Sequence, residues 1–142
     1  ILPKITDKQY YTNSFHLPVI YATSLFDKVT AEGQFHRLCN AGHISYVELK
    51  APPLHNVEAV DRIVRHMAAS DVGYGGINYP VDECRVCAYS GVFASNCPGC
   101  GSGEIRRIRR ITGYLSTEDR FNEAKRIELK DRRSHFEVAG HE

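Results

Sequence analysis

Two pairs of cysteines most strongly constrain what this chain can fold into. Each pair is a C-x-x-C motif, and nine residues separate the pairs. A tight turn, or knuckle, brings the two thiolates of such a motif together, and four thiolates form the ligand set that tetrahedral Zn²⁺ prefers. The spacer is long enough for a hairpin. The spacing therefore predicts a structural zinc site in residues 81–103 with the ligands Cys84, Cys87, Cys97 and Cys100.

The spacing alone leaves other uses of the four thiols open. Two disulfides, a redox-active pair or an iron ion in the same four-cysteine cage would fit it as well. The fifth cysteine, Cys39, lies in an apolar-leaning segment, where a small buried side chain is the simpler interpretation. An odd count with two close pairs favours metal binding in a reducing compartment over a disulfide framework. Four thiolates leave no open coordination position, so the metal should stabilise structure rather than catalyse.

Size and composition describe a modest globular domain. The chain has 142 residues, of which 42% are hydrophobic and 25% charged, and its net charge is +1. Such a charge attracts neither nucleic acid nor an anionic membrane overall. No run of eighteen apolar residues is present, which excludes a membrane-spanning helix, and residues 1–8 lack the pattern of a secretory signal. Because the chain starts without Met, we expect a piece of a larger protein.

The first half shows weak signals before one clear strand. Residues 14–21 form an aromatic-rich extended run that Pro18 reduces to an edge or broken strand. Ser24 or Thr23 should begin a short helix over residues 25–32, which Gly33 closes. Residues 43–49 form the clearest strand in the chain, in which Ile44, Tyr46 and Leu49 alternate against polar neighbours.

The best helix follows, over residues 57–69, with Asn56 as its N-cap. Its apolar positions recur every three to four residues, which predicts a buried face of Val57, Val60, Ile63, Val64 and Met67. A short strand at residues 77–79 ends at Pro80. The order strand, helix, strand predicts a parallel βαβ unit with a right-handed crossover. Such a unit buries little alone, so it should belong to a larger sheet or barrel.

Arginines and isoleucines alternate in the segment after the second cysteine pair. Residues 105–133 carry ten Lys and Arg against five Asp and Glu, so the basic character of the chain lies here. The segment fits a solvated basic face, or a phosphate or nucleic-acid patch. A non-enzymatic zinc-ribbon module that binds nucleic acid through Arg106 to Arg110 is therefore one candidate function. Gly113, taken alone, indicates only a backbone position that needs positive φ or a close approach.

The tail should form a helix that begins at Ser116 or Thr117. Glu128 and Arg132 are spaced as an ion pair on its surface. Its apolar stripe is thin, so we expect it to pack weakly and to serve as a mobile docking surface.

A family resemblance gives these signals a common function. Residues 108–115, IRRITGYL, resemble the R-x-x-G-Y core of glycyl radical enzymes. The cysteine pairs before it and DRFNEAKRIELKDRRSH after it narrow the likeness to the anaerobic, class III ribonucleotide reductases. Further similar stretches are YYTNSFHLPV, GHISYVEL and GGINYPVDECRVC. Thr112 and Ser116 depart from the general glycyl-radical pattern, but both lie beside the glycine.

The resemblance implies an α/β fold in three parts. Residues 1–80 would be the C-terminal segments of a ten-stranded glycyl-radical barrel, incomplete alone. Residues 81–103 would be the zinc knuckles, and residues 104–142 the radical loop and a helical tail. In this family a radical S-adenosylmethionine activating enzyme removes a Cα hydrogen from the glycine, here Gly113. The radical then passes to a thiyl cysteine, which lies outside this chain.

The resemblance also implies the partners and the setting. The chain would work with the remaining N-terminal part of the reductase, in a homo-oligomer in the full enzyme, and would be inactive alone. The ribonucleotide substrate would bind mainly outside the chain and be reduced to a deoxyribonucleotide for DNA synthesis. A cytoplasmic location without membrane attachment follows from the same resemblance.

Overall fold

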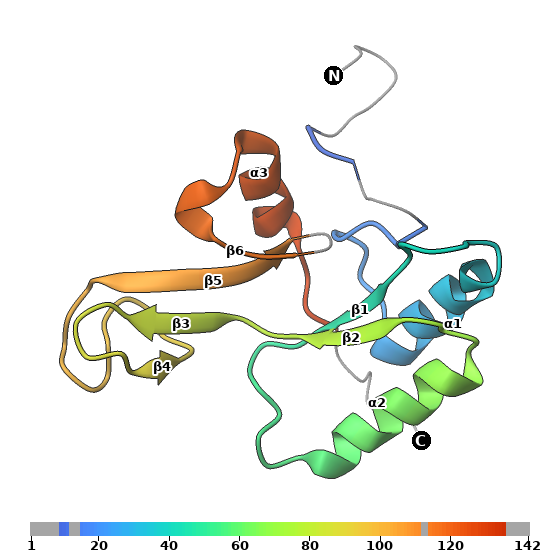
Figure 1. Cartoon of the computed structure of the whole chain (residues 1–142), viewed down its shortest axis with the longest axis horizontal. Helices are drawn as coiled ribbons and strands as arrows, with labels where there is room; N and C mark the ends of the chain where they lie inside the picture. Colours follow the sequence, from blue (N-terminus) through green and yellow to red (C-terminus); the bar gives the residue numbers. More distant parts are fainter. Residues whose placement is uncertain (1–8, 12–14, 112–113, 136–142) are drawn as a thin grey trace.

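The structure is a computed structural model that describes residues 9–11, 15–111 and 114–135. Figure 1 shows two neighbouring parts, which we call the βαβ unit (residues 25–78) and the knuckle sheet (residues 81–117), with a helix beside the second. In chain order the elements are α1 (Leu25–His36), β1 (Ser45–Glu48), α2 (Val57–Ala69), β2 (Gly75–Asn78), β3 (Val81–Cys84), β4 (Ser90–Gly91), β5 (Ile105–Ile111), β6 (Tyr114–Thr117), a 3₁₀ helix (Glu118–Arg120) and α3 (Glu123–Asp131).

Helix α1 starts where the sequence predicts and ends later. The Ser24 hydroxyl accepts a hydrogen bond from the Asp27 amide at 3.1 Å, as an N-cap does. The helix continues through Gly33, so the prediction that Gly33 closes it was wrong. A Cβ at Gly33 would lie 1.9 Å from the Ser70 carbonyl oxygen. Glycine is needed there because the end of α2 crosses α1 at close range.

The predicted parallel βαβ unit is present. Asn56 caps α2 by accepting a hydrogen bond from the Ala59 amide at 3.0 Å. Strands β1 and β2 pair in parallel, with Val47 opposite Ile77, and α2 connects them. The helices and β1 share an apolar core whose buried members are Leu25, Val29, Val47, Ile63 and Met67.

Two predicted faces differ from the structure. The fully buried residues of β1 are Ser45 and Val47, whereas Ile44 and Tyr46 are only partly buried. Leu49, just after the strand, is also partly buried and packs against the core. Ser45 is accommodated because its hydroxyl lies 2.9 Å from Nε2 of His36. On α2 only Ile63 and Met67 are buried. Val57 and Val64 are 77% and 53% exposed, so the apolar pattern was broader than the face that packs here.

The segment before α1 is held by buried charges rather than by strand pairing. The described residues 15–21 contain no strand. Glu32, which is 1% exposed, accepts hydrogen bonds from the Leu17 amide at 2.9 Å and from the Lys28 ammonium at 2.8 Å. Burial raises the pKa of Glu32, but hydrogen bonding to His16 and the charge of Lys28 outweigh it and lower the pKa to about 2. The ionised carboxylate therefore fixes this segment on α1.

The knuckle sheet has the strand order β4-β3-β5-β6, and all its pairs are antiparallel. Strand β3 follows β2 after only Tyr79 and Pro80, so one nearly continuous extended segment joins the two parts (Figure 1). Strand β5 is the longest and pairs with both β3 and β6. No helix within the described ranges is long and apolar enough to cross a membrane.

The tail begins with a strand and is firmly attached. The helix predicted to start at Ser116 or Thr117 is divided: Thr117 is the N-cap of the short 3₁₀ helix, without a side-chain cap hydrogen bond, and α3 begins later, capped by Asn122. Residues 114–117 themselves pair with β5 as a strand. The predicted pair of Glu128 and Arg132 is present at 2.5 Å. The Arg133 and His135 amides donate hydrogen bonds to the carbonyls of Val19 and Glu48. These bonds fix the end of the tail to β1 and to the segment before α1, which argues against weak packing.

Candidate metal centre

The four predicted ligands converge at the end of the knuckle sheet. All four Sγ atoms lie within 4.8 Å of one another, and no other such group of three or more metal-binding side chains occurs in the part of the chain that is described. The Sγ atoms of Cys84 and Cys100 are 3.5 Å apart, and those of Cys87 and Cys97 are 3.6 Å apart. Zinc–sulfur bonds of about 2.3 Å in a tetrahedron require sulfurs about 3.8 Å apart. The cysteines therefore fit a tetrahedral metal ion.

The first knuckle is a tight turn that starts at Cys84. The Cys84 amide donates to the Tyr89 carbonyl at 2.9 Å, and the Ala88 amide donates to the Cys84 carbonyl at 3.0 Å. Ala88 has a φ of 58°, a left-handed conformation that is uncommon for a residue with a Cβ. The turn brings Cys87 back toward Cys84.

The second knuckle repeats this turn from Cys97. The Cys97 amide donates to the Ser102 carbonyl at 2.8 Å, and the Gly101 amide donates to the Cys97 carbonyl at 2.9 Å. Gly101, at the position equivalent to Ala88, has a φ of 74°. The Gly99 amide also points at the Cys97 sulfur, 3.3 Å away. Backbone amides directed at sulfur stabilise thiolates, so the turn prepares its cysteines for a cation.

The pKa values of the Cys84 and Cys100 thiols are shifted in opposite directions. Hydrogen bonds from the Cys87 and Val86 amides, opposed by burial, lower the pKa of Cys84 to about 7. For Cys100 a hydrogen bond from Ser102 acts in the lowering direction, but the neighbouring thiols outweigh it and raise its pKa to about 12. Thiols so close together resist joint ionisation unless a cation shares their charge. The first cysteine of each pair is buried, against Phe93 and Ile105, and the second is exposed.

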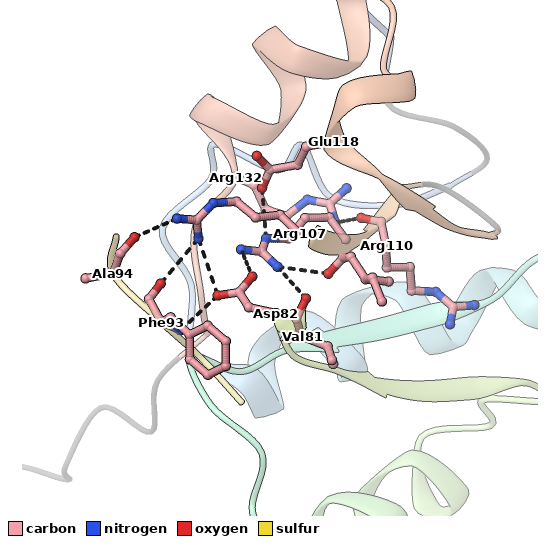
Figure 2. A network of polar contacts seen from close by, with 10 residues as sticks. Val81, Asp82, Phe93, Ala94, Arg107, Arg110, Glu118 and Arg132 are labelled. Atoms are coloured by element: carbon pink, nitrogen blue, oxygen red, sulfur yellow. Dashed lines mark hydrogen bonds and ion pairs between the residues drawn. The ribbon is translucent and has the colours of Figure 1, made fainter. Parts of the chain in front are cut away.

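A buried carboxylate connects the loop between the two knuckles to strand β5. Asp82 is fully buried, and its Oδ2 accepts a hydrogen bond from the Phe93 amide at 2.9 Å. Arg109 reaches its Oδ1 at 2.7 Å, and Arg107 reaches its Oδ2 at 3.3 Å. Figure 2 shows the Asp82 carboxylate joined by dashed lines to the Arg107 guanidinium and to Phe93. One aspartate thus joins β3, β5 and the segment between the two knuckles.

The two arginines extend the network in opposite directions. Arg107 donates to the carbonyls of Phe93 at 3.2 Å and Ala94 at 2.6 Å, on the loop between the knuckles. Arg109 contacts Glu118 of the 3₁₀ helix at 3.1 Å. The knuckle loop, the central strand and the start of the tail are therefore held as one body (Figure 2).

This network accounts for most of the arginines that suggested nucleic-acid binding. Arg106, on the other face of β5, pairs with Glu83 at 3.2 Å. Three of the four arginines thus have carboxylate partners within the chain, and Arg109 is only 15% exposed. The nucleic-acid module is not supported over the reductase interpretation, because paired and partly buried guanidinium groups offer little to a phosphate backbone.

Gly113, the predicted radical site, lies outside the described residues. Its flanks are described: Ile111 ends β5 and is opposite Tyr114, the first residue of β6. Ile111 is 2% exposed. The ammonium group of Lys125 lies over the Tyr114 ring, 4.6 Å from its centroid, and also hydrogen-bonds its hydroxyl.

Asp82 is the residue that sequence reasoning missed. A signal was available, because β3 carries Asp82 and Glu83 where β5 carries Arg107 and Arg106, and these residues are opposite one another in the sheet. Opposite charges in two neighbouring strand candidates indicate cross-strand pairing. That signal required β3 to be recognised as a strand, and residues 81–84 contain too little alternation for that.

Known proteins resemble this chain over nearly its whole length. A family model described as anaerobic ribonucleoside-triphosphate reductase matches residues 2–135. The anaerobic ribonucleoside-triphosphate reductase of Escherichia coli strain K12 is 38% identical over 147 aligned residues, which cover 96% of this chain and 20% of that protein. The protein of the same name from Enterobacteria phage T4 is 36% identical, with coverage of 92% and 23%. The chain therefore spans about a fifth of these relatives.

Solved structures show a similar fold. A structure of an anaerobic ribonucleotide reductase matches with a TM-score of 0.69 at 22% identity, covering 84% of this chain and 19% of that one. The Thermotoga maritima anaerobic ribonucleotide reductase with glycerol in its active site matches with a TM-score of 0.59 at 23% identity, covering 79% and 17%. At these identities the likeness concerns the arrangement of helices and strands.

Proposed function

The chain belongs to the anaerobic ribonucleoside-triphosphate reductase family, and on this premise we propose that it is the glycyl-radical-bearing part of a larger reductase. The complete enzyme would reduce ribonucleotides to deoxyribonucleotides for DNA synthesis. The observation that carries the proposal is the convergence of four cysteine sulfurs within 4.8 Å, on the same sheet whose β5 and β6 flank residue 113. A metal site beside the R-x-x-G-Y motif is what the family resemblance predicts.

Zinc would be held by Cys84, Cys87, Cys97 and Cys100 as a closed, four-thiolate site. When bound, it supplies structural stabilisation and no reacting group, because all four positions are taken by protein ligands. The Asp82 network supports this role, since it ties the loop between the knuckles to the strand that leads toward residue 113.

Gly113 would store the radical. Loss of one hydrogen atom from its Cα leaves an unpaired electron that spreads over the flanking amide groups. A residue without a side chain becomes planar there without hindrance. The hydrogen acceptor would be a radical S-adenosylmethionine activating enzyme, and the radical would then pass to a cysteine on the rest of the reductase.

The βαβ unit would be part of the reductase barrel. Its two parallel strands form a sheet of only two members within the described residues, and parallel sheets are normally covered on both faces. The remaining four fifths of the enzyme would supply the other strands, the substrate site and any homo-oligomer contact. Reduced thiols in the metal site suit the cytoplasm.

Reconstitution of activity tests the proposed function. The chain, the rest of the reductase and the activating enzyme are combined without oxygen, and deoxyribonucleotide formation is measured. Activity should appear and should be lost on Gly113→Ala. Gly103→Ala is the matched control, because a Cβ at Gly103 meets nothing within 4 Å and its backbone needs no special conformation. Activity that survives Gly113→Ala would refute the radical assignment.

Exposure to air gives a second readout from the same mixture. A glycyl radical reacts with oxygen and breaks the backbone at the glycine. Mass spectrometry should therefore find a product that ends near Thr112 in the activated wild-type chain and in Gly103→Ala, and none in Gly113→Ala.

A further inference from the structure

Arg110 differs from the other arginines of β5 in having no carboxylate partner among the residues that the structure describes. Arg106, Arg107 and Arg109 each pair with an aspartate or glutamate. The Arg110 side chain points away from Asp82 in Figure 2. Its guanidinium lies over the ring of Tyr46, 4.0 Å from the centroid, and donates a hydrogen bond to the Tyr46 hydroxyl. A ring face and a hydroxyl stabilise a cation but do not neutralise it.

The Nε atoms of Arg110 and Arg132 are both buried and make no hydrogen bond. Arg132 is adjacent, since its Nη1 donates to the Arg110 carbonyl at 2.7 Å. Buried N–H donors without an acceptor are uncommon, and each lowers stability unless a ligand or water accepts its hydrogen bond. Two such donors on neighbouring guanidinium groups indicate a missing acceptor.

Both arginines line one small cavity between β1 and the tail. It encloses about 50 Å³, and its walls include His16, Lys28, Tyr46, Glu48, Arg110 and Arg132. In the same measure a water needs about 10–15 Å³. The cavity therefore has room for several waters or for one small oxyanion, and it is too small for a nucleotide.

The carboxylates around the cavity are already engaged. Glu48 and Glu128 both pair with Arg132, at 3.2 Å and 2.5 Å. Glu32 pairs with Lys28 at 2.8 Å. None of these ion pairs includes Arg110. A guanidinium presents its N–H groups in a planar fork that matches carboxylate and phosphate oxygens.

We propose that this cavity binds a small oxyanion, a carboxylate or a phosphate, with Arg110 as its main cationic partner. Arg132 would add its Nε donor, and Tyr46 would hold the Arg110 guanidinium in place from its other face. The site is separate from the four cysteines, and it does not rest on the proposed radical chemistry.

Nuclear magnetic resonance of the arginine Nε–Hε groups tests the site on the full 142-residue chain. Sodium acetate and inorganic phosphate are titrated separately, with chloride keeping the ionic strength constant. We expect a saturable shift of the Arg110 and Arg132 Nε–Hε signals with at least one of the two anions. Saturation by acetate alone assigns a carboxylate site, and saturation by phosphate alone assigns a phosphate site. No saturable shift with either anion overturns the proposal.

Two matched variants distinguish binding of the anion in this cavity from a general attraction of anions to the basic strand β5. Arg110→Gln should weaken binding about tenfold or more, since it removes a charge-assisted hydrogen bond. Arg106→Gln, on the same strand and pointing at Glu83, should leave the affinity unchanged. Equal weakening in both variants would overturn the proposal. If Arg110→Gln does not fold, the wild-type titration and a Tyr46→Phe variant test the proposal instead. Tyr46→Phe keeps the ring under Arg110 and should retain binding.

Discussion

The βαβ unit and the knuckle sheet are neighbours that are stabilised in different ways. The βαβ unit buries a continuous set of apolar side chains from two helices and a strand. The buried cluster of the knuckle sheet near its cysteines consists of Cys84, Phe93 and Cys97, two of which are proposed metal ligands. The other buried residues described in this part are Ile111 and Asp82, whose carboxylate forms ion pairs with two arginines. The first part therefore depends mainly on the hydrophobic effect, with one buried ion pair in α1, and the second would depend on the proposed metal coordination and on ion pairs.

Metal removal should have the largest effect and should affect one part only. Structural zinc sites contribute about 10 kcal/mol or more of binding free energy. Chelation should therefore speed amide hydrogen exchange in residues 81–111 and 114–117 on the order of a thousandfold or more. Amides of residues 45–48 should keep their protection. Equal acceleration of amide hydrogen exchange in the knuckle sheet and in the βαβ unit would show that metal does not stabilise the knuckle sheet selectively.

Truncation of an apolar core side chain should destabilise the βαβ unit and leave the knuckle sheet unaffected. Ile63 is 5% exposed, and Ile63→Ala should lower the free energy of unfolding by about 2–4 kcal/mol through lost burial and a residual cavity. Its neighbour Val64 is 53% exposed, so Val64→Ala should cost less than about 1 kcal/mol. Denaturant unfolding measures both, and the bound metal per chain should stay at the wild-type value. Metal loss in Ile63→Ala would mean that the core supports the knuckles directly.

Replacing the buried carboxylate should weaken the knuckle sheet specifically. Asp82→Asn keeps the shape but leaves Arg107 and Arg109 without their charge partner, at a cost of about 3 kcal/mol. Glu83→Gln is the control, since its pair with the half-exposed Arg106 should be worth less than about 1 kcal/mol. Metal affinity and exchange in β3 and β5 report the difference. A cost for Glu83→Gln as large as that for Asp82→Asn would contradict the role given to the buried network.

Acidification should act on the βαβ unit and its attached tail. Burial lowers the pKa values of His36 and His43, and it lowers that of His135 from 6.5 to about 4. The Nδ1 of His135 accepts the Glu48 amide at 2.9 Å, which requires a neutral ring. Because the unfolded chain takes up these protons first, stability is full above about pH 7 and declines as the pH falls through 6.5 toward 4.

For His135 alone the loss between pH 7.5 and pH 5 should be about 2 kcal/mol. Urea unfolding at the two pH values measures it. His135→Asn keeps an acceptor for the Glu48 amide and should remove this part of the pH dependence. An unchanged dependence in that variant would show that His135 is not responsible.

Local signals in the sequence were enough for much of the βαβ unit. Ser24 and Asn56 are caps whose effect depends on the next three residues, and both start helices where expected. The cysteine spacing likewise predicted the four ligands that the structure brings together. The caps depend on residues within three positions, and the cysteine inference depends on two short motifs separated by a short spacer.

The features that could not be predicted depend on how separate helices and strands pack against one another. Gly33 is required by Ser70, which belongs to the end of another helix. The buried face of β1 includes Ser45 because His36 supplies a hydrogen-bond partner. The late start of α3 follows from the pairing of β6 with β5. Whether an arginine of β5 forms an ion pair likewise depends on which residues of the neighbouring strand lie opposite it.

The most direct test of the proposed radical is electron paramagnetic resonance of the anaerobically activated chain. One remaining α-hydrogen on Gly113 should split the radical signal into a doublet. In protein grown with α,α-dideuterated glycine, the doublet should collapse to a narrow single line, because deuterium couples far more weakly. A doublet that is unchanged by this labelling, or a signal that persists in Gly113→Ala, would contradict the assignment.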